Sequence, residues 1–176
     1  MGLLDLMRRD IHTELQAMRR YALVLTRSAD QAEDLVQEAL TRAIASAHAW
    51  RPDGELRRWL LAIVHNTYLK RLQRQKVERA AAGEASWAHD RTLPPPQAAR
   101  VELARTMAAL MELPQEQRTV LVLVAFEGLN YRDAAEILGI PLGTLMSRLA
   151  RGREALRTAT GRDTPRKIRS TLQVVR

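Results

Sequence analysis

Apolar side chains recur every three to four positions along most of this chain, which is the spacing of one face of an α-helix. In the first half, the pattern predicts helices at about residues 11–26 and 31–47. A loop at 50–55 with Pro and Gly precedes a third helix of about 20 residues. Strand-like alternation of Val, Ile and Thr is nearly absent. The pattern therefore predicts an all-α chain.

The second half repeats the helical spacing after a break. Residues 77–96 lose the apolar period and end in three prolines, which predicts a flexible linker between two small helical domains. We place the first domain at residues 1–76 and the second at residues 97–157. The second contains helices at 97–112 and 115–126 and then a helix-turn-helix. The tail, residues 158–176, is basic and expected to be disordered.

The first domain shows one clear helix start and two buried faces. Asp30 and Glu33 have the spacing of a capping box at the start of the second helix. The apolar stripe of that helix comprises Leu35, Val36, Ala39, Leu40, Ala43, Ile44 and Ala47. In the third helix, we expect Leu56, Leu60, Ile63 and Val64 inside. Among the side chains that we expect on its outer side is His65.

The helix-turn-helix has recognisable boundaries and two distinct faces. Asn130 is placed to cap its first helix, Leu129 to pack beside the cap, and Gly139 to end that helix. Turning about 100° per residue places four residues of the second helix on its packed side: Leu145, Leu149, Gly152 and Leu156. About 120° away, the same rotation places a polar group: Thr144, Ser147, Arg148 and Arg151. The second helix thus turns an arginine-bearing face to solvent.

That face has the chemistry needed to read DNA. The arginine fork suits guanine edges and phosphates, and hydroxyl groups reach phosphates or bases. A solvated basic side of an ordinary amphipathic helix is the simpler alternative. The preceding helix and the turn of suitable length favour DNA contact.

Charge and composition narrow the class of protein. The net charge is +8, and residues 148–176 alone hold 9 Lys and Arg against 2 Asp and Glu. The basic end therefore coincides with the reading helix, as expected for a partner of a polyanion. The absence of cysteine fits a reducing cytoplasm. No apolar run approaches the roughly 20 residues that span a bilayer, so we expect a cytoplasmic protein without membrane insertion.

The order of several motifs resembles an extracytoplasmic function (ECF) sigma factor of bacterial RNA polymerase. They lie at residues 30–38, 56–61, 63–66, 113–118 and 143–149, and the resemblance covers about residues 11–157. It implies a first domain like sigma region 2 and a second like sigma region 4. It also implies a chain that binds the polymerase core and directs it to promoters.

The resemblance assigns core docking to one face of the second helix. Asp34, Gln37 and Glu38 lie at positions i, i+3 and i+4, so they present acceptors together. In the family, this surface docks on the coiled coil of the largest polymerase subunit. A solvated acidic stripe is the simpler alternative for such a pattern.

The resemblance assigns promoter DNA to both domains. For the −10 strand, an aromatic wall, an amide and cations would hold an unstacked base and its backbone. The candidates are Trp50, Arg57, Arg58, Trp59, Asn66, Lys70, Arg71 and Arg74. For the −35 element, the candidates are Thr144, Ser147, Arg148 and Arg151, with Arg153 as a phosphate contact. Met146 and Gly152 depart from the family pattern, and Gly152 is expected to weaken its helix slightly.

Other functions fit the sequence less well. No nucleophile motif or Gly-rich phosphate loop appears, and no histidines have paired metal spacing, so we expect no enzyme, cofactor or metal. A stand-alone dimeric helix-turn-helix regulator remains the alternative. A sigma mimic that only sequesters an inhibitor is disfavoured, since both DNA-binding halves look intact. The resemblance further implies control by an anti-sigma factor that clamps between the domains.

Overall fold

The computed structural model describes residues 3–50, 55–82 and 101–161, and every regular element in these ranges is helical. The N-terminal elements are α1 (Leu3–Thr26), α2 (Ala29–Ala45), the short 3₁₀-helix η1 (Ala47–Ala49) and α3 (Leu56–Ala82). The C-terminal elements are α4 (Val101–Glu112), α5 (Gln115–Leu121), the π-helical turn η3 (Val122–Phe126), α6 (Tyr131–Leu138) and α7 (Leu142–Ala159). The predicted all-α class, with a three-helix domain and a helix-turn-helix domain, is confirmed.

Helices α1, α2 and α3 pack on one another around large apolar side chains. Met18, Leu35 and Leu60 are fully buried. Burying a side chain of this size contributes about 1.5–3 kcal/mol. One member of the predicted α2 stripe differs: Ile44 is 58% exposed, because it lies at the edge of the stripe beside buried Ala43.

The start of α2 differs from the predicted capping box. The Ser28 hydroxyl, not Asp30, accepts a hydrogen bond from the backbone N–H of Gln31. Glu33 instead forms an ion pair with Arg19 of α1, at 2.8 Å. Asp30 remains in the first turn, where its negative charge interacts favourably with the positive end of the helix dipole.

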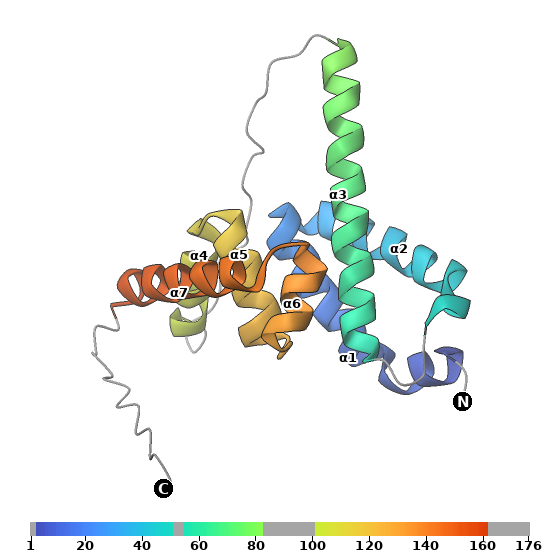
Figure 1. Ribbon diagram of the computed structural model, residues 1–176, viewed down its shortest axis with the longest axis horizontal. Coiled ribbons are helices and arrows are strands. Elements are labelled where there is room, and N and C mark those ends of the chain that lie inside the picture. The colour runs from blue at the N-terminus through green and yellow to red at the C-terminus, as the bar shows by residue number, and fades with distance from the viewer. Residues whose placement is uncertain (1–2, 51–54, 83–100, 162–176) are drawn as a thin grey trace, which may run out of the picture.

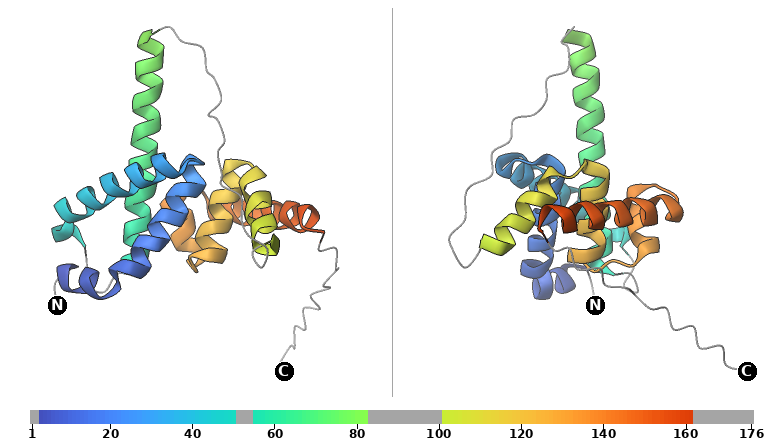
Figure 2. Two further views of the ribbon diagram at one scale, coloured as in Figure 1. Left: turned by 180° about the vertical axis from the view of Figure 1, so that it is seen from behind. Right: turned by 90° about the vertical axis from the view of Figure 1, so that its left-hand side faces the viewer.

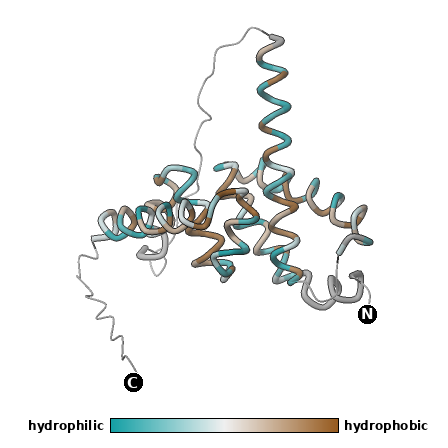
Figure 3. Tube along the Cα trace, in the orientation of Figure 1, coloured by the Kyte–Doolittle hydropathy of each residue, from teal (hydrophilic) through white to brown (hydrophobic). Residues whose placement is uncertain are grey.

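Helix α3 is longer than predicted and projects beyond the body (Figure 1). It continues through Ala82, into the segment 77–96 that the sequence assigned to a linker. Its residues there are good helix formers, and Arg74 pairs with Glu78 one turn on at 2.7 Å. Figure 3 shows this projecting half as largely hydrophilic. The rest of the predicted linker and the tail beyond 161 lie outside the described residues.

The helix-turn-helix forms as predicted. The Asn130 side chain accepts from the N–H of Asp133 at 2.9 Å, and Gly139 ends α6 with a φ of +62°. Leu145 and Leu149 of α7 are buried. Local sequence therefore sets both the boundaries and the packed side of this unit. Among the described residues, no helix is long and apolar enough to span a membrane.

The two domains pack against each other. Figures 1 and 2 show α6 beside α3 and α5 beside α1, and these pairs are in contact. The fully buried guanidinium of Arg118 (α5) donates from Nε to the carbonyl of Val24 in α1, at 2.9 Å. Arg20 of α1 makes two hydrogen bonds, each 2.9 Å, to the buried carboxylate of Glu127. The C-terminal domain is thereby held on the N-terminal one.

His65 lies inside the protein, so its predicted outward position is wrong. Its Nδ1 lies 2.9 Å from the hydroxyl of Tyr21 in α1, and the two rings stack. Helix α1 covers this side of α3, which the sequence pattern of α3 alone does not reveal. Burial lowers the pKa of His65 to about 4, so the ring is neutral at pH 7.

This burial predicts a pH dependence of stability. Between pH 6.5 and about 4, the unfolded chain binds a proton at His65 that the native chain does not. The stabilisation is present above pH 6.5 and is lost as pH falls through the native pKa, by up to roughly 3 kcal/mol. Urea unfolding from pH 7.5 to 4 should therefore show a steeper loss for the wild type than for His65→Gln. Equal slopes would contradict the prediction.

Gly152 has a packing role that the sequence did not reveal. A Cβ at this position would lie 2.9 Å from Cδ1 of Leu121 and 3.3 Å from Cβ of Gln117. Both residues belong to α5. The glycine therefore lets α7 lie close to α5, in addition to weakening its own helix.

A large side chain at this position should separate α7 from α5. Gly152→Leu should lower the free energy of unfolding by about 1–3 kcal/mol, the usual cost of overpacking. Ala150→Leu is the matched control, because Ala150 lies on the same helix and is exposed. Urea unfolding of both variants measures the difference, and equal stabilities would show that the close approach is not tight.

Candidate DNA and polymerase interfaces

Helix α7 presents its predicted reading face unevenly. Ser147, Arg151 and Arg153 are exposed, and Nε of Arg151 donates to the carbonyl of Ser147 at 3.3 Å. Thr144 is half-buried. Arg148 forms an ion pair with α5, because its Nη2 lies 2.8 Å from the carboxylate of Glu116. Arg151 is thus freer to meet a base than Arg148.

Two apolar side chains lie beside this face: Leu142, which the sequence reasoning missed, and Met146, which it noted only as a departure from the family pattern. Leu142 is 41% exposed and Met146 is 51% exposed. They are one turn apart at the start of α7, so helical spacing and the absence of a covering partner would have been the signal. Exposed apolar groups at this place can contact thymine methyl groups in a major groove.

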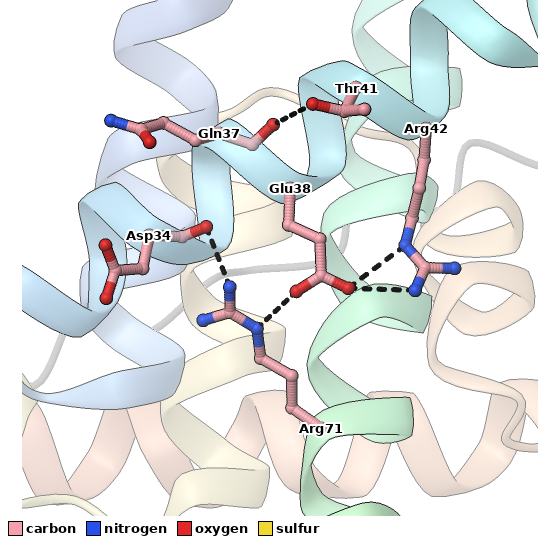
Figure 4. Close-up of polar contacts among 6 residues, drawn as sticks. All are labelled: Asp34, Gln37, Glu38, Thr41, Arg42 and Arg71. Carbon is pink, nitrogen blue, oxygen red and sulfur yellow. Dashed lines mark hydrogen bonds and ion pairs between the residues drawn. The ribbon is translucent and has the colours of Figure 1, made fainter.

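The predicted docking residues share one face of α2 but differ in their freedom (Figure 4). Asp34 and Gln37 are exposed. Glu38 is bound from two helices: Oε1 accepts from Arg42 at 2.8 Å and Oε2 accepts from Arg71 at 2.6 Å. Burial acts to raise the pKa of Glu38, but hydrogen bonds from Arg42 and Arg71 outweigh it and lower the pKa. Glu38 is therefore a charged, oriented acceptor.

These residues line a hollow of about 710 Å³ between α2 and α3. Asp34, Gln37 and Glu38 come from α2, and they meet Lys70, Arg71 and Arg74 of α3. The structure thus brings together residues that the sequence assigned to two different partners, the polymerase and the −10 strand.

The predicted −10 aromatic and amide residues do not share one environment. Trp50 is 7% exposed and belongs to the hydrophobic core. Its indole Nε1 has no acceptor among the described residues. Trp59 is half-buried against the same core, whereas Asn66 is exposed. In this arrangement Trp50 is a core residue, and Asn66 is the one of the three whose side chain is exposed.

Most of the predicted −10 cations are paired with carboxylates of this same chain. Arg57 binds Glu14 through two hydrogen bonds of 3.1 Å, which raise the pKa of Arg57. Arg74 binds Glu78, and Arg71 binds Glu38. Lys70 is exposed and forms no ion pair within the described part of the chain. A phosphate would have to displace a carboxylate at each of the paired sites.

Arg58 is paired across the domains. Its Nε lies 3.2 Å from Asp133 and its Nη2 lies 2.5 Å from Glu136, both on α6. The helix-turn-helix therefore covers part of the predicted −10 surface. The described ranges contain no cluster of three or more His, Asp or Glu side chains that could hold a metal ion.

Comparison with known proteins identifies both halves. The family described as "Sigma-70, region 4" matches residues 103–156, and the one described as "Sigma2 domain of PhyR" matches residues 11–65. The ECF RNA polymerase sigma factor EcfG of Rhodopseudomonas palustris (strain TIE-1) is 40% identical over 158 residues, which are 89% of this chain and 86% of that protein.

Two further relatives agree. The ECF RNA polymerase sigma factor SigM of Mycobacterium tuberculosis is 37% identical over 82% of this chain and 71% of its own length. The sigma factor RpoE of Bartonella quintana, solved in complex with the anti-sigma factor NepR, superposes with a TM-score of 0.76 at 29% identity. That match covers 89% of this chain and 98% of RpoE. The chain therefore belongs to the family of ECF RNA polymerase sigma factors.

Proposed function

We propose that this sigma factor docks on the polymerase core through the α2 face and reads the −35 element with α7. We further propose that the arrangement seen here, in which the two domains pack against each other, is a closed and inactive form. The observation that carries the proposal is the exposed Ser147–Arg151 face of α7, on a helix-turn-helix whose other side is packed. The exposed Asp34 and Gln37 beside oriented Glu38 support the docking role.

For the −35 element, Arg151 is the leading base contact. Its guanidinium is exposed and can present a fork to guanine O6 and N7. Ser147 lies one turn earlier, and Arg153 stands beside the face as a phosphate contact. Arg148 must first leave Glu116, so its contribution is smaller than that of Arg151.

For the −10 strand, the paired candidate arginines become available only when a phosphate replaces their carboxylate partner. Asn66 and Lys70 are open to solvent, but Arg58 is held by α6. Because Asp133 and Glu136 belong to the −35 domain, separation of the domains would free Arg58 from both carboxylates. Closure therefore suppresses −10 binding and leaves the −35 face of α7 exposed.

An anti-sigma factor would act on this closed form. RpoE was solved with its anti-sigma factor, and this chain has a groove of about 630 Å³ lined by both domains. Leu25 and Tyr68 line it from the N-terminal domain, and Leu113 and Gln115 from the C-terminal one. Gln115 also hydrogen-bonds to Tyr68 at 3.1 Å. A partner bound there stabilises closure, because the groove exists only while the domains touch.

Two variants should separate −35 recognition from binding to core polymerase. Arg151→Ala should reduce −35-dependent run-off transcription by about 10- to 100-fold, as expected for loss of a bidentate base contact. Its affinity for core polymerase should not change. Glu38→Ala should weaken core affinity by about tenfold or more, as for a central interface residue.

Purified core, fluorescence titration and run-off transcription on one promoter measure both effects. Arg105→Ala serves as the control, because Arg105 is exposed on α4, which carries neither of the two faces. Loss of core binding in Arg151→Ala would show that the assignment of the two domains is wrong.

The closed form can be tested without polymerase. The chain has no cysteine, so Ala45→Cys and Thr158→Cys place two dyes on exposed ends of α2 and α7. Glu127→Gln with Glu136→Gln removes carboxylates that hold Arg20 and Arg58, and should shift the energy-transfer distribution toward separated domains. High salt should do the same, because exposed pairs are screened. Glu33→Gln is the control, and an unchanged distribution in the double variant would show that the ion pairs of Arg20 and Arg58 do not hold the domains together.

A further inference from the structure

Arg71 differs from its neighbours in what it binds. Its Nε donates to Oε2 of Glu38 at 2.6 Å, and its Nη2 donates to the backbone carbonyl of Asp34 at 2.8 Å (Figure 4). Both acceptors belong to the proposed docking face of α2. One guanidinium therefore ties α3 to the side chain of one docking residue and the main chain of another.

The other cations of α3 at this hollow lack such ties. Arg74 pairs only with Glu78 of its own helix, and its side chain is 81% exposed. Lys70 forms no ion pair with any described residue. The Arg71 side chain, in contrast, is 31% exposed. The three cations look alike in the sequence. Of the three, Arg71 is the one that hydrogen-bonds to α2.

Glu38 is oriented by the combination of Arg71 and Arg42. Arg42 holds Oε1 from one turn further along α2, and Arg71 holds Oε2 from α3. Each carboxylate oxygen has further acceptor capacity, and the side chain of Glu38 is still 34% exposed. The carboxylate is thus fixed in position and remains able to accept a donor from a partner.

We propose that Arg71 is a positioning residue of the polymerase-docking face and not a contact of the −10 strand. This inference rests on the proposed docking role of α2. Fixing Glu38 before binding removes part of the entropy cost of ordering it in the interface. Use of Arg71 on a phosphate would instead break its bonds to Glu38 and Asp34 and leave Glu38 held by Arg42 alone.

A double-mutant cycle on core affinity tests the assignment. Arg71→Ala should weaken core binding by about 2- to 10-fold, the range expected for losing the preorganisation of one side chain. In a Glu38→Ala background the same change should have little further effect, because Arg71 acts through Glu38. Arg71→Lys should restore part of the affinity, since an ammonium group can keep the Glu38 contact but not both bonds.

The DNA readout separates positioning from strand contact. Holoenzyme formed at saturating core should bind a −10 single-strand probe equally well with Arg71→Ala and wild type. Arg74→Ala should give the opposite pattern, with weaker probe binding and the same core affinity. Circular dichroism and urea unfolding confirm that each variant is folded.

Three results would overturn the inference. Weaker probe binding by Arg71→Ala at saturating core would make Arg71 a DNA contact. Multiplying losses in the double variant would make Arg71 independent of Glu38. If Glu38→Ala and Arg71→Ala both bind core like the wild type, the docking role of α2 fails and the inference fails with it. In the first two cases the proposed docking face stands.

Discussion

The closed arrangement depends on Arg118, whose guanidinium is buried where the two domains meet. It donates to the carbonyls of Met111 and Leu113 at the end of α4, and to that of Val24 in the last turn of α1. Carbonyls at helix ends lack partners within the helix and carry the negative end of the dipole. The Arg118 guanidinium therefore supplies hydrogen-bond donors to the C-terminal ends of α1 and α4, which belong to different domains. This explains why a charged side chain can be buried here.

Closure at Arg118 fixes which functional groups remain accessible. It sets α6 against α3, so Arg58 meets Asp133 and Glu136. It leaves the exposed side of α7 untouched, since α7 packs on α4, α5 and α6. The same packing thus covers Arg58 of the proposed −10 surface and leaves the proposed −35 face of α7 exposed. Among the candidate −10 arginines of the described residues, Arg58 is the one whose carboxylate partners come from the other domain.

The sequence predicted much of the local structure, although it placed the cap of α2 at Asp30 and the structure has it at Ser28. The cap at Asn130, the stop at Gly139 and the buried side of α7 follow from residues within a few positions of one another. It failed where contacts join distant segments: His65 with Tyr21 is 44 positions apart, and Arg58 with Glu136 is 78. Helical periodicity describes one helix at a time, so it could not indicate which neighbour covers each face.

The same limit applies to charge. A net charge of +8 suggested cations ready for DNA, yet Arg57, Arg58, Arg71 and Arg74 are each paired with a carboxylate of this chain. Such pairs weaken non-specific attraction to a polyanion, because counterion release needs unpaired cations. Those that are partly exposed also cost little to exchange. The charge that this surface offers to DNA is therefore smaller than the net charge of +8 suggests.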